Sequence, residues 1–129
     1  MKPNPVVWFE IYVQDMARAQ RFYESVFQCK LQTLDAPEGE AHGMQMLSFP
    51  SDNMTTNGAT GALVKMQGAP SGGGGTLVYF SCDDCAVEQC RVEAASGKVF
   101  KPKFSIGPYG HIALVVDTEG NCIGLHSMN

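Results

Sequence analysis

The first candidate for chemistry is the stretch VWFEIYVQDM at residues 6–15, which predicts a β-strand running into the start of a helix. Alternation along a strand puts Trp8, Glu10 and Tyr12 on one face. These side chains carry an indole, a carboxylate and a phenol, which suit ligand or substrate contacts. The opposite face carries only apolar side chains, which predict core packing: Phe9, Ile11 and Val13.

Glu10 has two interpretations that the sequence leaves open. A carboxylate in an apolar hollow can act as a general base in catalysis. It can equally be a structural carboxylate that accepts hydrogen bonds from a Tyr hydroxyl or a backbone amide. His126 is open in the same way, because it could pair with Glu10 or make a structural hydrogen bond.

Five cysteines include Cys82 and Cys85 in the motif CDDC, a spacing found in redox and zinc sites. A redox site needs an accessible thiol of lowered pKa at a helix N-terminus. Cys82 is predicted to face a helix instead, and the intervening aspartates disfavour a thiolate. Zinc would need two more ligands, which no second CxxC and no histidine pair supplies. We therefore expect free thiols here.

Composition limits the function classes. The chain has 129 residues, 44% of them hydrophobic and 17% charged, which predicts one compact domain over 1–129. The net charge of −4 argues against a nucleic-acid partner, because phosphate contacts need a basic face. No apolar run reaches the roughly 18–20 residues of a membrane span, and Pro3 and Pro5 interrupt any signal-like N-terminus. The expected location is the cytoplasm.

The elements that position the candidate residues are predicted in the same order twice. In the first half, a helix follows the N-cap Asp15, because apolar residues recur at helical spacing in MARAQRFYESVF. Strands are predicted near 30–35 and 44–49 and at 61–67. The helical stripe is predicted to be core, with a partner-binding face as the alternative: Met16, Ala19, Phe22, Tyr23, Val26 and Phe27.

The segment GAPSGGGG at 68–75 predicts a flexible Gly-rich linker. A phosphate loop would need a Lys, a hydroxyl and a helix after the glycines, whereas a strand follows. The pattern then restarts with the strand TLVYFSCDD and the helix CAVEQCRVEAASG, capped by its acidic residues and closed by Gly97. Three strands complete it: KVFKPKF, HIALVVD and CIGLHSM. His111, at a strand start, is expected to be exposed to solvent.

Placing Asp15 on Asp84 gives an offset of 69 residues (84 − 15) between the halves. Both halves then predict strand, helix and three strands. This is an α+β fold of two βαβββ modules, about 5–67 and 76–129, whose strands form a curved half-barrel sheet around a cavity with the helices outside. The side chains predicted to line the cavity are Trp8, Glu10, Tyr12, Val64, Met66, Leu77, Tyr79, Ser81, Gly124 and His126.

Three stretches carry a family resemblance: FEIYVQDMARAQRFYESVF, VYFSCDDCAVEQCRVEAASGKV and DTEGNCIGLHSM. Over almost its whole length the chain resembles the glyoxalase/bleomycin-resistance/extradiol-dioxygenase family, also called the vicinal oxygen chelate superfamily. It is most similar to the small single-domain members related to lactoylglutathione lyase. The resemblance implies the same half-barrel fold and a homodimer. It leaves the activity open, because the fold hosts lyases, isomerases, dioxygenases, thiol transferases and drug-binding proteins.

In metal-using members, the resemblance implies a divalent metal held by residues on the first and last strands of each half. The matching positions here are Trp8, Val64, Leu77 and Gly124, which offer no donor atom for a cation. A register slip of two residues would bring Glu10 and His126 into ligand positions, but these are only two ligands. We therefore expect no metal and no other cofactor.

Two functions remain. We expect a protein that binds a small apolar or aromatic molecule in its cavity without a metal, with Trp8 and Tyr79 either stacking on the ligand or filling the cavity. The alternative is an enzyme, either a divergent glyoxalase-like lyase or a metal-free catalyst, that uses Glu10 and His126. A third and weaker possibility is a structural dimer without a cavity.

Overall fold

The computed structural model describes residues 1, 3–35, 43–52 and 58–129. Backbone contacts divide the chain into two compact units. The first unit is Trp8–Thr76, and the second unit combines Met1–Val7 with Leu77–Asn129. The N-terminal segment joins the second unit, where the Ser81 amide donates a hydrogen bond to the Pro5 carbonyl at 2.9 Å.

The first unit contains β1 (Val6–Tyr12) from Trp8 onward, α1 (Met16–Phe27), β2 (Gln32–Leu34), β3 (Gln45–Ser48) and β4 (Thr60–Lys65). Its strands are hydrogen-bonded in the order β2-β3-β4-β1. β1 and β4 run parallel, and β3 is antiparallel to both β2 and β4. The predicted N-cap is present: the Asp15 carboxylate accepts a hydrogen bond from the Arg18 amide at 3.0 Å.

The second unit contains β5 (Thr76–Ser81) from Leu77 onward, α2 (Cys85–Val92), β6 (Lys98–Ser105), the short 3-10 helix η1 (Gly107–Tyr109), β7 (His111–Val116) and β8 (Cys122–Ser127). Its strands follow the order β5-β8-β7-β6. β5 and β8 are parallel, whereas β8–β7 and β7–β6 are antiparallel. The α+β class and the repeated order of strand, helix and three strands are thus confirmed.

The helix α2 is shorter than predicted. It ends at Val92, and a turn over 93–96 separates it from Gly97, whose amide donates to the Val92 carbonyl at 2.9 Å. A Cβ at position 97 would lie 2.7 Å from the Val116 carbonyl oxygen. Glycine is therefore needed here for a close backbone approach to β7.

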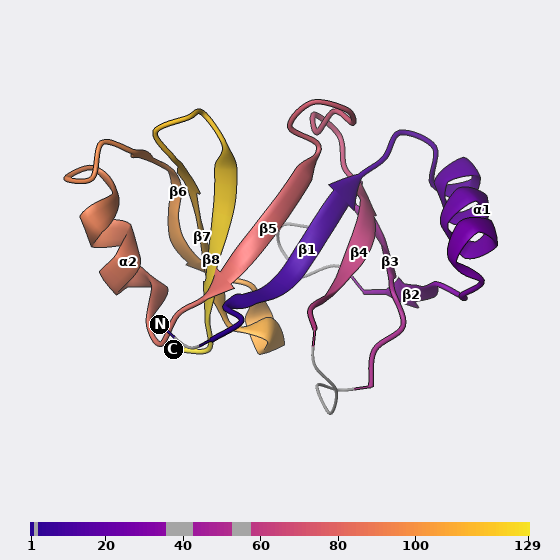
Figure 1. Ribbon diagram of the computed structural model, residues 1–129, viewed down its shortest axis with the longest axis horizontal. Coiled ribbons are helices and arrows are strands. Elements are labelled where there is room, and N and C mark those ends of the chain that lie inside the picture. Colours follow the sequence, from indigo (N-terminus) through magenta and orange to yellow (C-terminus); the bar gives the residue numbers. More distant parts are fainter. Residues whose placement is uncertain (2, 36–42, 53–57) are drawn as a thin grey trace. The chain divides into compact units, whose positions relative to one another are not determined.

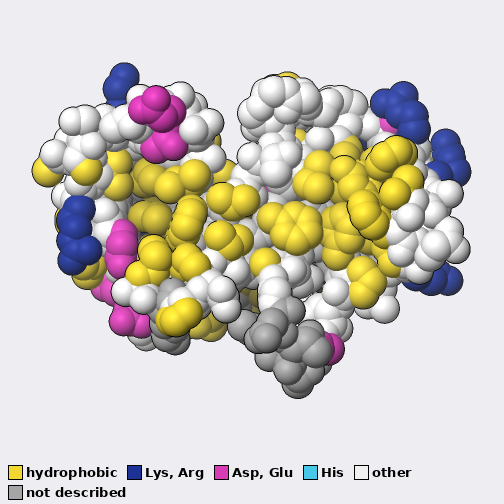
Figure 2. Space-filling model, viewed as in Figure 1, with side chains coloured by type: hydrophobic (Ala, Val, Ile, Leu, Met, Phe, Trp, Pro, Cys, Tyr) yellow, Lys and Arg dark blue, Asp and Glu magenta, His cyan; other side chains and the backbone are white. Residues whose placement is uncertain are grey.

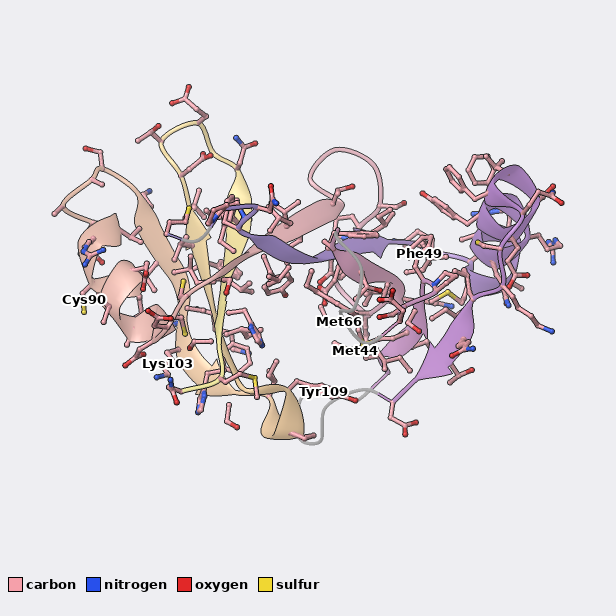
Figure 3. All side chains as sticks on the ribbon, turned by 60° about the horizontal axis from the view of Figure 1, so that its bottom comes forward. Met44, Phe49, Met66, Cys90, Lys103 and Tyr109 are labelled. Atoms are coloured by element: carbon pink, nitrogen blue, oxygen red, sulfur yellow. The ribbon has the colours of Figure 1, made fainter. Side chains whose placement is uncertain are left out.

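Each unit has an apolar core between its helix and its sheet. In the first unit, Val13 and Leu63 are buried with Leu31 against α1 residues, and Phe49 lies toward α1 (Figure 3). In the second unit, the fully buried Cys85 of α2 packs with Val115 and neighbouring apolar residues. α1 contacts β4, and α2 contacts β6, β7 and β8 (Figure 1). The predicted face of β1 that contains Ile11 and Val13 is indeed the helix-facing one.

The prediction that the whole apolar stripe of α1 is core is wrong for half of it. Met16, Ala19 and Tyr23 pack on the core. The other three side chains are exposed: Phe22 by 58%, Val26 by 56% and Phe27 by 64%. Six apolar positions span a wider arc of a helix than one sheet can cover. Figure 2 shows hydrophobic side chains beside basic ones at the α1 end of the molecule.

Two hollows border this exposed part of α1. One, of about 710 Å³, lies along Arg21, Phe22 and Val26. The other, of about 390 Å³, lies between the end of β1, the start of α1 and Ser71. Phe22 lines both hollows. Neither includes any predicted cavity residue except Tyr12.

The Gly-rich segment 68–75 connects β4 to β5 as a series of hydrogen-bonded turns. The Gly75 amide donates to the Gly72 carbonyl at 2.8 Å, and the Gly75 carbonyl accepts from the Tyr12 amide at 2.7 Å. The Gln14 side chain donates to the Ala69 carbonyl at 3.0 Å. These bonds attach the segment to the end of β1.

Candidate functional site

The face of the first unit that points away from α1 is apolar and rich in sulfur. Met46, Ala62 and Val64 are buried there, and Val64 is only 1% exposed. Half-buried neighbours pack on them, and Figure 3 shows two of these, Met44 and Met66, close together. The full set of half-buried neighbours is Trp8, Tyr12, Leu34, Met44 and Met66. The predicted residues Trp8, Tyr12, Val64 and Met66 therefore share one surface.

Glu10 occupies the middle of this surface and is held by its two neighbours on β1. Trp8 Nε1 donates to Glu10 Oε2 at 3.1 Å, and the Tyr12 hydroxyl donates to Glu10 Oε1 at 2.6 Å. Residues two apart on a strand point the same way, so this chain of bonds follows from the alternation alone. Both carboxylate oxygens are acceptors in this arrangement. The geometry matches the structural interpretation of Glu10.

The second unit has an equivalent face on the side of β5 away from α2. Phe80 and Cys82 pack against the α2 core, so Leu77, Tyr79 and Ser81 point the other way. Leu77 and Tyr79 are buried. Tyr79 pairs with Gly124 across β5 and β8.

The Tyr79 ring fills the space above Gly124. A Cβ built at position 124 would lie 2.1 Å from Tyr79 Cδ1, which is closer than atoms can approach. Position 124 therefore carries no side chain because an aromatic ring already occupies its place. This matches the interpretation in which Tyr79 fills the interior.

His126 is oriented by the short helix η1. Its Nε2 lies 2.6 Å from the Tyr109 carbonyl oxygen. A carbonyl only accepts hydrogen bonds, so Nε2 carries the hydrogen and Nδ1 of the neutral ring keeps a lone pair. The His126 carbonyl also accepts from the Cys82 amide at 2.7 Å, which fixes the backbone. Ser81 pairs with His126 in the sheet register.

The register corrects the matching of the last strands. Glu10 pairs with Ala62, and Tyr79, its counterpart at the offset of 69 (79 − 10), pairs with Gly124. Gly124 therefore corresponds to Ala62, an offset of 62 (124 − 62), and Val64 corresponds to His126. The treatment of Val64 and Gly124 as equivalent positions is thus wrong by two residues. The segments between helix and last strand differ in length, and a single offset cannot hold across them.

The corrected positions still do not fit a metal ion. The first strands place Trp8 and Leu77 at the candidate ligand positions. The last strands add one of two pairs of residues, either Ala62 with Gly124 or Val64 with His126. The first set has no donor for a cation and the second has one imidazole. Within the described part of the chain, no three His, Cys, Asp or Glu side chains gather in a way that could hold a metal.

The CDDC motif is built into the fold of the second unit. Cys85 is fully buried in the core, and its amide donates to the Ser127 hydroxyl at 3.0 Å. Burial, with the nearby Glu88 carboxylate, raises the pKa of the Cys82 thiol to about 11, the reverse of a redox thiolate. Asp84 is the N-cap of α2, as the acidic residues predicted.

His111 differs from its predicted exposure. It is half-buried, and its Nδ1 lies buried without a hydrogen-bond partner among the described residues. Its imidazole lies near enough to the Asp84 carboxylate for an electrostatic interaction. The strand start is therefore less open to solvent than the turn signal before it suggested.

The sequence predicted a strand at KVFKPKF but not which face of the sheet Lys101 and Phe104 occupy on β6. The register between β6 and β7 shifts twice, between Val99 and Lys101 and between Lys101 and Phe104. These bulges place Lys101 opposite Leu114 and Phe104 opposite Ile112. Pro102 was the available signal, because proline inside a strand marks an edge or a bulge.

No protein-family model matches the chain. Two curated proteins called "Putative glyoxylase CFP32", from Mycobacterium bovis and Mycobacterium tuberculosis, are each 29% identical to it over 125 residues. The match covers 95% of this chain and 45% of each relative, so the chain spans less than half the length of these relatives.

Two solved structures show the fold. One is a variant of methylmalonyl-CoA epimerase from Streptomyces coelicolor in complex with 2-nitronate-propionyl-CoA. It has a TM-score of 0.67 and 15% identity, over 95% of this chain and 96% of that one. The other is methylmalonyl-CoA epimerase from Mycobacterium tuberculosis. It has a TM-score of 0.66 and 13% identity, over 100% of this chain and 93% of that one. The described residues contain no helix with the length and apolar character to cross a membrane.

These similarities agree with the resemblance found in the sequence: the chain is similar to two proteins called putative glyoxylases, and it has the α+β fold of the methylmalonyl-CoA epimerase structures.

Proposed function

We propose that the protein binds a small apolar or aromatic molecule without a metal, on the sheet faces that point away from its helices. In the first unit the proposed contacts are Trp8, Tyr12, Val64 and Met66, with Glu10 between them. In the second unit they are Leu77, Tyr79, Ser81, Gly124 and His126. Methionine and aromatic side chains suit apolar ligands of varied shape, because thioethers are flexible and polarizable.

One observation carries this proposal. Both oxygens of Glu10 accept hydrogen bonds from Trp8 and Tyr12, so this carboxylate is engaged by its own strand. An apolar cluster of Met46, Ala62 and Val64 makes up the buried part of the face, and the hydroxyl side chains of Ser48 and Thr60 share the face with it. A surface of this kind favours an apolar ligand over a hydrated cation.

Trp8 provides a direct test, because it is the single tryptophan of the chain. Titration with naphthalene-type and other small aromatic compounds, with a chelator present throughout, should change Trp8 fluorescence saturably. Met66→Gln should weaken the binding about tenfold, since it places an amide on the apolar face. Met128→Gln is the matched control, because Met128 is 65% exposed.

Two results would contradict the proposal. The first is the absence of any saturable change across such a panel. The second is equal weakening by Met66→Gln and Met128→Gln. Melting temperatures of both variants show whether each remains folded.

A glyoxalase-like lyase or other enzyme using Glu10 and His126 is the second candidate. It is favoured by the orientation of His126, whose bond to the Tyr109 carbonyl leaves Nδ1 as an acceptor. The test is conversion of the methylglyoxal–glutathione adduct to lactoylglutathione. Turnover that Glu10→Gln and His126→Gln each reduce at least a hundredfold would favour the enzyme. Turnover unaffected by both would exclude these roles.

We also propose that the chain forms a homodimer. The exposed Phe22, Val26 and Phe27 of α1 support this, because three clustered apolar side chains are costly to leave in water. Light scattering on a sizing column should give about twice the chain mass of 13.9 kDa. Val26→Lys should shift the dimer toward monomer if α1 is in the interface, and a monomeric wild-type chain would contradict the proposal.

A further inference from the structure

Three methionines lie together on the face of the first unit that points away from α1. The register of β3 and β4 places Gln45 opposite Lys65. Met44 and Met66 each lie one residue beyond that pair, so they stand opposite one another where the two strands meet their end. Figure 3 shows these two side chains close together. Both pack against the buried cluster that contains Met46, so the face carries a cross-strand pair of thioethers beside a third.

The three thioethers differ in exposure. Met46 is buried, with 8% of its surface exposed. Met44 and Met66 are only half-buried, and Trp8 packs against the same buried cluster. A small solute meets a half-buried side chain directly, whereas it reaches a buried one only when the structure opens. Reagents dissolved in water therefore reach Met44 and Met66 more readily than Met46.

A thioether reacts with hydroperoxides by transfer of one oxygen atom. The sulfur lone pair attacks the nearer peroxide oxygen, the O–O bond breaks and an S–O bond forms. The sulfur is oxidised by two electrons to a sulfoxide, and the other oxygen takes up the proton and leaves as water or an alcohol. Methionine sulfoxide reductases reverse the change with electrons from thiols. Each cycle thus exchanges an apolar side chain for a polar one and back.

An oxygen on these sulfurs would change the surface that the proposed ligand contacts. An apolar ligand that covers a sulfoxide removes its oxygen from water and offers it no hydrogen-bond donor, which opposes binding. The nearby indole of Trp8 cannot supply that donor, because its N–H already donates to Glu10 Oε2 at 3.1 Å. Oxidation of Met44 and Met66 therefore acts against an apolar ligand.

We propose that hydroperoxides switch off ligand binding by oxidising Met44 and Met66, and that reduction of the two sulfoxides restores it. The inference rests on the proposed function and adds the regulation of that same site. Met128 has no part in the switch, because it is 65% exposed and does not belong to the methionine cluster.

The test measures ligand affinity of the full chain by isothermal titration calorimetry, before and after treatment with hydrogen peroxide. The probe is 2-naphthol or, if it binds more tightly, another member of the aromatic panel used with Trp8. Dithiothreitol follows removal of the peroxide, because it reduces disulfides and sulfenic acids of the free cysteines. Fragment-ion mass spectrometry locates the added oxygen at each methionine.

Oxidation at Met44 and Met66 should weaken binding by the wild-type chain about tenfold. Incubation with methionine sulfoxide reductases A and B should restore the affinity, since each enzyme reduces one epimer of the sulfoxide. Melting curves of the oxidised chain show whether it remains folded. A loss of binding that accompanies loss of the melting transition overturns the switch, because unfolding would then be its cause.

Each variant is compared with itself before and after peroxide, so its own starting affinity does not enter the comparison. The variant with both Met44→Leu and Met66→Leu should keep its affinity within about twofold on treatment, and Met66→Leu alone should lose less than the wild type. Met128→Leu is the matched control, which should lose as much affinity as the wild type.

Three results overturn the switch and leave the binding function in place. Met44 and Met66 could stay unoxidised while Met128 is fully converted. The wild-type affinity could remain unchanged although both positions are oxidised. The variant with leucine at both positions could lose as much affinity as the wild type. Failure of the whole aromatic panel to bind the untreated chain overturns the proposed function, and this inference with it.

Discussion

Individual residues of the candidate site are explained by what fills the space around them. Gly124 is small because the Tyr79 ring lies where its side chain would be. Glu10 is a carboxylate because Trp8 and Tyr12 each donate a hydrogen bond to it. These pairs act as units, so changing one member should have an effect that depends on the other.

Substitution of Gly124 tests this dependence. Gly124→Ala should destabilise the fold by about 2 kcal/mol, because the new methyl group would overlap the Tyr79 ring. In a chain that already carries Tyr79→Ser, the same substitution should cost less than about 0.5 kcal/mol. Urea unfolding of the two single variants and the double variant measures the coupling.

Gly73→Ala is the control, because nothing lies within 4 Å of a Cβ built there. It should change the free energy of unfolding by less than about 0.5 kcal/mol. Equal costs for Gly124→Ala with and without Tyr79 would show that the ring is not the cause.

For some individual residues, the sequence alone was enough to predict the position of the side chain. The alternation of β1 was sufficient to place Trp8, Glu10 and Tyr12 on one face, and the Tyr bond to Glu10 was one of the two stated interpretations. The bond from His126 to the Tyr109 carbonyl was not predictable, because it joins residues 17 apart through a short helix that has no apolar period.

At the scale of elements, caps and alternation were predictable and bulges were not. Asp15 and Asp84 begin the two helices as predicted. In β6, plain alternation would put Lys101 and Lys103 on one face, and the two bulges separate them. A bulge depends on the pairing partner, which the local sequence does not contain. The width of the α1 stripe was visible in the sequence, but the extent of the sheet that covers it was not.

The cap of α2 gives a pH-dependent prediction. The Lys103 ammonium and the Ala86 amide hold the pKa of the Asp84 carboxyl below its ordinary value of 3.8. A carboxyl of lowered pKa stabilises the folded state above its unfolded pKa, and this contribution is lost as the pH falls through the folded value. The stability difference between wild type and Asp84→Asn should therefore be full at pH 7 and vanish near pH 2.

Urea midpoints of the two proteins across this range measure the effect. Asn retains the capping oxygen, so the variant isolates the charge. Asp83→Asn serves as the control, because Asp84 rather than Asp83 is the N-cap. A difference that stays constant with pH would mean that the charge of Asp84 does not contribute.

At the scale of the whole molecule, the repeat was the most informative feature of the sequence. The offset of 69 correctly related the first strands and the helices of the two halves. It failed on the last strands, where the register gives 62, because the connecting segments differ in length. The order of the elements and the face on which each side chain lies could therefore be predicted from the sequence pattern. Which residue of one half corresponds to which residue of the other could be found only from the pairing of β1 with β4 and of β5 with β8.

Small-molecule binding by this chain is proposed to need no metal. The most direct measurement is the metal content of the purified chain, determined by mass spectrometry on the same sample that shows a ligand-induced rise in melting temperature. Metal-free binding predicts far less than one Zn, Ni, Mn or Fe per chain and a rise in melting temperature that a chelator leaves unchanged. One metal per chain, with the rise abolished when it is removed, would contradict it.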